Sequence, residues 1–247
     1  SPEALQYRAH RGLIDRDEQM AVLVQRVSGA VHGHLFYPQV AGVGLSYNPY
    51  VWSERIDPEA GVLRLVFGLG TRAVERSDDD YTRLVALNEP LRRPETPGDD
   101  GGTGYSQRRV DVLDLSANRF TSQTIDDVVR VSPELPIDYY ATRRSTLLRG
   151  RGTSSRREEG GWVLQFGKLL SETPFVPYLR EMLGILRDAY EYPVDTEFTA
   201  NFPPGGRCLV NLVQCRPLQV KEGGTIVDPP KRIPRSALLL ESRGPVI

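Results

Sequence analysis

The apolar positions of the chain fall into short, β-branched runs that predict strands. Residues 40–47 are almost wholly apolar and stop at Asn48-Pro49, and residues 62–67 run directly into Gly68. Runs of this length bounded by turn residues are typical of buried strands. The same pattern predicts three more strands, at 20–27, 81–87 and 109–115, the first of them buried and ended by Ser28-Gly29.

The clearest helical pattern comes late in the chain. Val176, Leu179 and Leu183 begin a series of apolar residues at three- and four-residue steps, which predicts an amphipathic helix to about Tyr190. Thr173 is the expected N-cap, Pro174 suits the first helical position, and Pro193 prevents continuation.

A hairpin is predicted to follow this helix. Strand-like runs at 194–200 and 208–216 flank the turn sequence Pro-Pro-Gly-Gly at 203–206. The remaining segments are a short helix within 1–14, an exposed loop at 94–104, a mobile surface loop at 143–161, a buried run at 162–166 and a linker over the last thirty residues.

Composition removes several classes of function. The net charge of −1 provides no global positive field for nucleic acid or an anionic membrane. The 31 basic residues include only three lysines, of which Lys168 is the first. A GC-rich codon bias explains this imbalance, yet it excludes a Schiff-base or P-loop lysine before that position.

Cysteine and histidine usage gives no metal or disulfide pattern. Cys208 and Cys215 are seven apart on one predicted strand, so we expect opposite faces and no bridge. Among the three histidines, His32 and His34 are interpreted as solvated loop residues rather than zinc ligands. With no signal peptide or long apolar run, the expected compartment is the cytoplasm, without membrane contact.

The predicted hairpin carries the most promising chemistry. Asp195, Glu197 and Thr199 share one face of their strand, and Gln214 and Arg216 share a face of the partner. If the faces coincide, Glu197 and the Gln214 carbonyl offer oxygen ligands to Mg²⁺, and Arg216 offers a fork to phosphate. A plain cross-strand ion pair on the surface is the alternative interpretation, and spacing alone leaves it open.

A glycine-rich segment matches a dinucleotide pattern only loosely. Gly68, Gly70 and Ala73 follow a predicted strand as G-x-G-x-x-A, with Glu89 near the expected acidic offset. The following stretch 72–80 holds six charged residues and little packing surface, which argues against a Rossmann helix. No complete P-loop motif occurs.

Taken in order, several segments resemble the nucleotide-binding domain of the phosphoenolpyruvate synthase and pyruvate phosphate dikinase family. They lie between about residues 18 and 220, and the most specific are Asp195-Thr196-Glu197-Phe198-Thr199 and the later Leu212-Val213-Gln214-Cys215-Arg216-Pro217. The others are at 22–27, 40–49 and 66–70. The resemblance implies an α+β, ATP-grasp-like fold with mainly antiparallel sheets and packed helices. Its first lobe would be incomplete, residues 1–220 forming the partial domain and 221–247 a linker toward further domains.

The resemblance also implies ligands and roles for particular residues. ATP and Mg²⁺ are the expected cofactors, with Gln25, Arg26 and Val27 beside the base and Gly68 and Gly70 near the nucleotide. Glu197 and Gln214 resemble the ligands of the Mg²⁺-ATP complex, and Arg216 resembles the catalytic arginine that contacts phosphate. The phosphoryl group would pass through a histidine on another domain to pyruvate in a third domain of the same parent chain.

Departures from the family pattern shape the remaining expectations. Thr71 stands where a glutamate is common, Glu197 and Gln214 are 17 residues apart, and the lysine, the phosphoacceptor histidine and the pyruvate barrel are missing. We therefore expect a piece of a longer enzyme, inactive by itself, whose acceptor (pyruvate, an antibiotic hydroxyl or a glucan) is undetermined. The alternative is a non-catalytic regulatory module, and an exposed apolar face would allow a homodimer.

Overall fold

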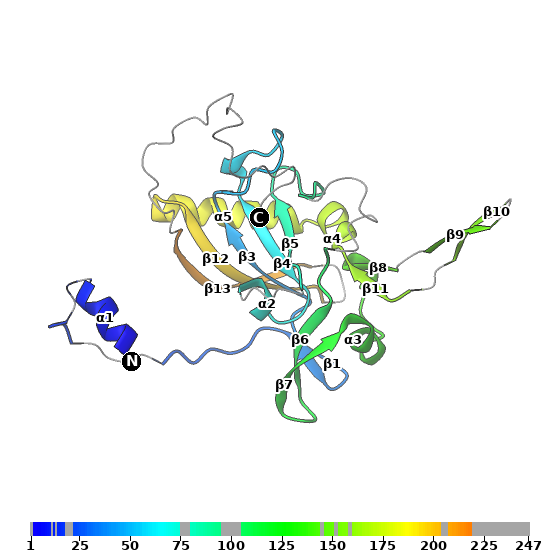
Figure 1. The fold of residues 1–247 in the computed structure, drawn as a ribbon, viewed down its shortest axis with the longest axis horizontal. Coiled ribbons are helices and arrows are strands. Elements are labelled where there is room, and N and C mark those ends of the chain that lie inside the picture. The colour runs from blue at the N-terminus through cyan, green and yellow to red at the C-terminus, as the bar shows by residue number, and fades with distance from the viewer. Residues whose placement is uncertain are drawn as a thin grey trace, which may run out of the picture.

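The chain forms an α+β structure whose sheets are built from antiparallel strand pairs, as seen in a computed structural model (Figure 1). The structure describes residues 2–10, 12, 14–17, 22–74, 80–94, 105–143, 146–150, 153–157, 160–203 and 207–218. No described helix is long and apolar enough to cross a membrane.

A five-stranded sheet forms the body of the fold, in the order β13-β12-β3-β4-β5. Every neighbouring pair is antiparallel. The bounds are β3 Val40–Leu45, β4 Val62–Val66, β5 Arg83–Ala86, β12 Val194–Asn201 and β13 Leu209–Pro217. All five strand runs predicted for these positions are confirmed, with ends that differ by one or two residues.

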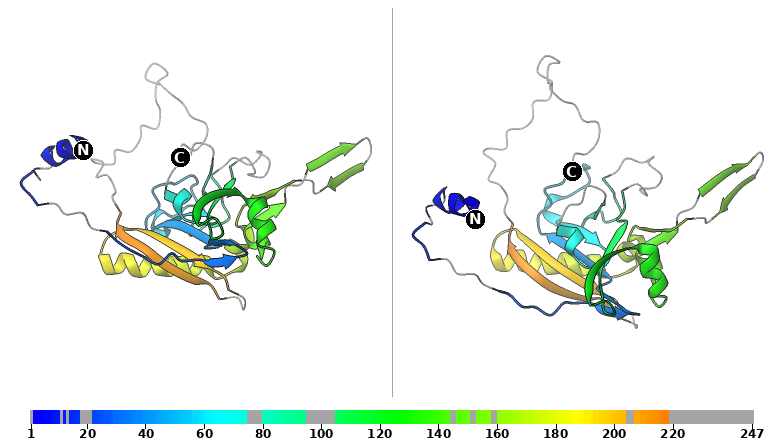
Figure 2. Two further views of the ribbon diagram at one scale, coloured as in Figure 1. Left: turned by 90° about the horizontal axis from the view of Figure 1, so that it is seen from below. Right: turned by 60° about the horizontal axis from the view of Figure 1, so that its bottom comes forward.

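The helix α5, Phe175–Tyr190, covers one face of this sheet (Figure 2). Buried and half-buried residues alternate along β12 because its even-numbered side chains point toward the helix. At Gly44 on β3, a Cβ would lie 3.0 Å from Thr196 Oγ1 and 3.4 Å from a methyl carbon of Leu183 on α5. The glycine therefore gives the helix room to approach.

The predicted start of α5 is displaced by one residue. The helix begins at Phe175, and Pro174 occupies the cap position. Thr173 still acts as a cap, since its hydroxyl accepts a hydrogen bond from the Phe175 amide at 3.2 Å. It also donates to the Leu169 carbonyl at 2.6 Å, which ties α5 to the preceding helix α4, Gly167–Glu172.

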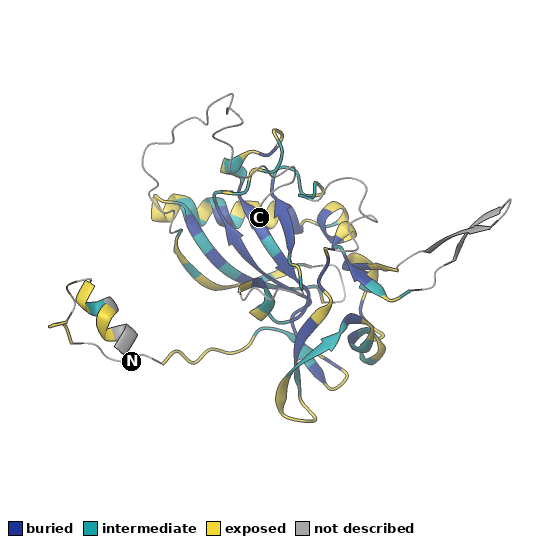
Figure 3. Ribbon diagram, viewed as in Figure 1, coloured by how far each residue is buried: buried dark blue, intermediate teal, exposed yellow. Residues whose placement is uncertain are grey.

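A second, four-stranded sheet packs beside the first, in the order β1-β2-β6-β7. The core is continuous between the sheets, because Leu35 and Val110 of the small sheet belong to the same buried cluster as Leu63 and Phe198 of the large one (Figure 3). Its elements are β1 Ala30–His32, β2 Leu35–Tyr37, β6 Arg109–Asp114 and β7 Arg119–Thr124, followed by α3 Ile125–Val131.

The other elements are short. They comprise α1 Pro2–His10, α2 Thr71–Val74, β8 Ala141–Arg143, β9 Thr146–Gly150, β10 Thr153–Arg157, β11 Trp162–Leu164, and the 3-10 helices Pro58–Ala60 and Ile137–Tyr139. The helix predicted near the N-terminus is confirmed as α1, and the buried run at 162–166 as β11 with buried Val163, Leu164 and Phe166.

Two sequence predictions about backbone are wrong. Residues 22–27 form no strand, and the side chains of Val22, Leu23 and Val24 are 82%, 79% and 88% exposed. Their apolar pattern indicates a strand, yet no described strand pairs with them.

The segment 143–161 is not wholly loop, because β9 and β10 pair as a hairpin that projects from the body (Figures 1 and 2). Most of the loop predicted at 94–104 and the linker at 221–247 lie outside the described residues.

The packing of α5 generates a stability prediction. Leu179 is completely buried against the sheet, whereas Ile185 on the same helix is mostly exposed. Leu179→Ala should lower the free energy of unfolding by about 2–5 kcal/mol through lost burial and a residual cavity. Ile185→Ala is the matched control and should change it by about 0.5 kcal/mol or less. Chemical denaturation measures both, and equal losses would contradict this packing.

Candidate functional site

The predicted hairpin places its polar residues opposite one another. Glu197 on β12 pairs with Gln214 on β13, and Asp195 pairs with Arg216. The faces of the two strands therefore coincide, as the sequence analysis required. These side chains lie on the face of the sheet opposite to α5, because the residues between them on β12 are buried against the helix.

A β-bulge at Val213 sets this pairing. Glu197 lies opposite Gln214 while Phe198 lies opposite Leu212, so Val213 has no partner in β12. The odd-numbered side chains of β13 therefore point to opposite faces of the sheet on the two sides of Val213, and so do the even-numbered ones. Cys208 and Cys215 consequently both pack against the main core, and the prediction of opposite faces is wrong, although both cysteines are free as expected.

The sequence left two interpretations of the hairpin open, a magnesium and phosphate site or a cross-strand ion pair. The ion pair is formed by Asp195 and Arg216. Both Nε and Nη2 of Arg216 donate to Asp195 Oδ2, at 3.0 and 2.7 Å. Hydrogen bonding to Asp195 raises the pKa of the Arg216 guanidinium, so this is the cross-strand ion pair. The Glu197 carboxylate makes no hydrogen bond or close ion pair within the described part of the chain, although its negative charge also contributes to the raised pKa of Arg216.

A large open groove, about 2040 Å³ in volume, runs past this hairpin. Gln25, Arg26, Val27, Gly70 and Glu197 all contribute to its wall. Its main stretches are residues 25–32, 69–71, 134–136, 172–174, 197–199, 201–203 and 208–213. Three of the predicted site residues, Gly68, Gln214 and Arg216, do not line the groove. Gln214 nevertheless lies directly beside Glu197 on the neighbouring strand.

The extended segment 22–29 reaches the groove through Ser28. Its hydroxyl oxygen accepts hydrogen bonds from Asn211 Nδ2 at 2.9 Å and from Asn201 Nδ2 at 3.4 Å. Gln25, Arg26 and Val27 come immediately before this anchor. The structure thus brings the three residues predicted beside the base to the same groove as Glu197, more than 160 positions later in the chain.

The two glycines after β4 have different surroundings. Gly68 has a φ of 92°, and a Cβ there would lie 2.6 Å from a Val110 methyl and 2.7 Å from the Asp111 carbonyl oxygen. It therefore allows β4 to approach β6 closely. Gly70 opens on the groove, and a Cβ there would be 3.5 Å from the Cβ of Ala41.

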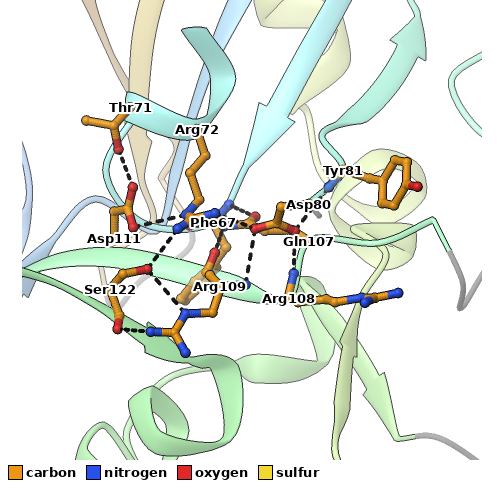
Figure 4. A network of polar contacts seen from close by, with 10 residues as sticks. All are labelled: Phe67, Thr71, Arg72, Asp80, Tyr81, Gln107, Arg108, Arg109, Asp111 and Ser122. Atoms are coloured by element: carbon orange, nitrogen blue, oxygen red, sulfur yellow. Dashed lines mark hydrogen bonds and ion pairs between the residues drawn. The ribbon is translucent and has the colours of Figure 1, made fainter. Parts of the chain in front are cut away.

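A polar network that the sequence patterns did not predict lies just beyond these glycines (Figure 4). Arg72 donates from Nη1 to Asp80 at 2.8 Å, from Nε to Asp111 at 3.0 Å and from Nη2 to Ser122 at 2.9 Å. The Thr71 hydroxyl donates to the other oxygen of Asp111 at 2.6 Å. The network holds the groove wall at Gly70-Thr71 against the four-stranded sheet.

The Asp80 carboxylate extends this network into the backbone. It accepts hydrogen bonds from the amides of Tyr81, Arg108 and Arg109 at 3.0, 2.6 and 3.2 Å. The sequence signal was present, because Asp80 ends the charged stretch after the glycines. The antiparallel pairing of β4 with β3 and β5 agrees with the interpretation against a Rossmann unit, but the charged stretch gave no hint of the partners of Asp80.

The groove is also lined by a buried histidine, His32. His32 Nδ1 lies 2.9 Å from Glu134 Oε1, and its ring centre is 4.6 Å from that of Tyr37. Burial raises the pKa of Glu134, but the hydrogen bond from His32 lowers it, with a net lowering. His34 is exposed as predicted, whereas the prediction of a solvated His32 is wrong because its ring is buried against Tyr37 and Glu134.

The residues at the hairpin fit a magnesium–nucleotide complex better than a metal site made of protein alone. The described residues contain no cluster of three or more His, Cys, Asp or Glu side chains that could hold a metal. Mg²⁺ in nucleotide sites usually takes one or two carboxylates, with substrate phosphates and water filling the other positions. The unpaired Glu197 carboxylate and the neighbouring Gln214 amide match that donor set.

Comparison with known proteins gives a family for the chain. The family model described as pyruvate phosphate dikinase, AMP/ATP-binding domain, matches residues 1–236. No curated protein matches the chain. The family match covers nearly the whole sequence and includes every residue discussed above.

The Arg72 network generates a second stability prediction. The side chains of Asp80 and Asp111 are only 5% and 7% exposed, so Arg72→Met would leave two buried carboxylates without their cation. We expect a loss of about 3–5 kcal/mol in the free energy of unfolding. Arg130→Met removes an arginine from an exposed pair with Asp127 and should change it little. Denaturant titration of both variants measures the contrast, and similar effects would contradict a structural role for Arg72.

The environment of Cys208 generates a prediction on reactivity. Burial raises the pKa of Cys208 to about 11. Only the thiolate reacts with alkylating agents, so near pH 8 this thiol should react roughly a hundredfold more slowly than an ordinary one. Its rate should keep rising with pH until about 11. Iodoacetamide kinetics on Cys215→Ser, which leaves only Cys208, test this, and a rate that levels off below about pH 9 would contradict it.

Proposed function

Because the chain belongs to the pyruvate phosphate dikinase AMP/ATP-binding domain family, we propose that its groove binds Mg²⁺-ATP. The chain would contribute the nucleotide site of a phosphoenolpyruvate synthase-like phosphotransferase. The single observation that carries this proposal is the position of Glu197. Its carboxylate has no described ion-pair partner, faces Gln214 and lies on the wall of the groove.

The hairpin supplies charge and oxygen donors at the phosphate end. Glu197 and the Gln214 carbonyl would hold the metal, which when bound would neutralise phosphate charge. Arg216 would contact the phosphates through the part of its guanidinium that Asp195 leaves free, since its side chain is 59% exposed. Phosphoryl transfer depends on positioning and charge stabilisation more than on covalent catalysis, and these side chains offer both.

The base would lie at the other end of the nucleotide. Gln25, Arg26 and Val27 are exposed or half-exposed at the groove, next to the Ser28 anchor. An exposed extended backbone offers free amide and carbonyl groups to a base. Gly70 would border the nucleotide, whereas Gly68 would act by shaping the turn that places Gly70.

The wider reaction involves other parts of a parent chain. We propose that residues 1–220 act with a phosphohistidine domain and a pyruvate-binding domain in the cytoplasm, and that 221–247 link to them. The exposed Val22, Leu23 and Val24 favour packing against such a domain or against a second copy in a homodimer. A regulatory module that binds nucleotide without transfer is the second candidate, because Arg216 is already paired with Asp195.

Replacement of Glu197 tests the proposed site. Glu197→Gln removes a charge with little change in shape and should weaken Mg²⁺-ATP binding by about tenfold or more, as measured by isothermal titration calorimetry. Glu181→Gln is the matched control, because Glu181 is exposed on α5 behind the sheet. Unchanged affinity in Glu197→Gln, or equal losses in both variants, would overturn the assignment.

A further inference from the structure

Three buried polar atoms on residues that line the groove have no hydrogen-bond partner in the described part of the structure. They are His32 Nε2, Thr199 Oγ1 and Asn201 Oδ1. Buried polar groups in native proteins are nearly always paired, because an unpaired one loses its hydration without compensation. Two of the three lie close together on β12, which suggests that a ligand supplies their partners.

Thr199 and Asn201 continue the row that begins at Glu197. All three lie on the same side of β12, because alternate residues of a strand share a face. Successive members are about 7 Å apart along the strand. The Asn201 amide nitrogen is already directed to Ser28 at 3.4 Å. Rotating the side-chain amide of Asn201 by half a turn would exchange its oxygen and its nitrogen. One of these two atoms therefore lacks a partner in either orientation.

The position of this row indicates which part of a nucleotide it would meet. Glu197 marks the phosphate end, and Ser28 follows directly on Val27 at the base end. Ribose lies between base and phosphates in a nucleotide, and its two hydroxyls can each donate and accept.

We propose that Thr199 and Asn201 form a ribose subsite, through which the groove selects ribonucleotides over deoxyribonucleotides. This inference rests on the proposed binding of Mg²⁺-ATP. The ribose hydroxyls would provide the hydrogen bonds that the Thr199 hydroxyl and the Asn201 amide lack. Both oxygens are shielded from solvent, so binding would turn these side chains or shift segment 22–29 to admit the sugar.

The test compares four ligands on the full chain by calorimetry: the magnesium complexes of ATP, 2′-deoxy-ATP, 3′-deoxy-ATP and tripolyphosphate. The unsubstituted protein should prefer ATP over at least one deoxy analogue by about three- to tenfold, the value of one neutral hydrogen bond. Thr199→Val should remove a preference of that kind, Asn201→Ala should reduce it, and Thr199→Ser should keep it. Tripolyphosphate should bind all variants equally.

Two controls separate ligand binding from folding. Thr121→Val on β7 lies away from the groove and should leave every affinity unchanged. Thr199→Val removes a hydroxyl without a partner, so the melting temperature of the ligand-free protein should not fall.

The possible outcomes test the ribose subsite separately from the proposed binding of Mg²⁺-ATP. Equal binding of ATP and both deoxy analogues, or a preference that survives in Thr199→Val and Asn201→Ala, overturns the ribose subsite while the nucleotide site stands. Failure of the unsubstituted protein to bind either Mg²⁺-ATP or Mg²⁺-tripolyphosphate overturns the proposed function and the subsite together.

Discussion

The guanidinium of Arg72 is the contact on which the arrangement of the two sheets depends. It satisfies two nearly buried carboxylates, Asp80 and Asp111, and a hydroxyl on β7, while it stands at the end of the turn that leaves β4. Buried carboxylates are tolerable only when they are paired. This side chain therefore joins the glycine turn that borders the groove to the four-stranded sheet.

The hydrophobic core holds the two sheets and α5 together. A single buried cluster runs from the small sheet through the large sheet to α5, so the two sheets share this core. A second, smaller cluster fills the opposite face of the large sheet around Val43 and Val66. The half-buried row on β12 lies at the margin of that face, where side chains are held firmly by the sheet yet remain beside open space.

The sequence predicted most of the regular parts of this structure. Strand runs such as 62–67, the helix ending at Tyr190 and the hairpin at 194–216 follow from local patterns, which a chain carries within a few residues. The pairing of Glu197 with Gln214 depends on the bulge at Val213, which no local pattern predicted. Residues 22–27 show the limit, because a strand requires a partner as well as a suitable sequence. The Arg72 network and the His32–Glu134 contact join positions up to 102 residues apart, and no local pattern records such pairings.

The single extra residue at Val213 has a consequence for how the hairpin tolerates change. It divides β13 into two halves with independent registers, one paired with 194–197 and the other with 198–201. Length variation in the connection at 202–208 can be absorbed in the outer half, where one residue of slippage is already accommodated. The inner half, which holds Glu197 against Gln214, is thereby insulated from insertions at the tip, and the long separation of these two residues does not disturb their meeting.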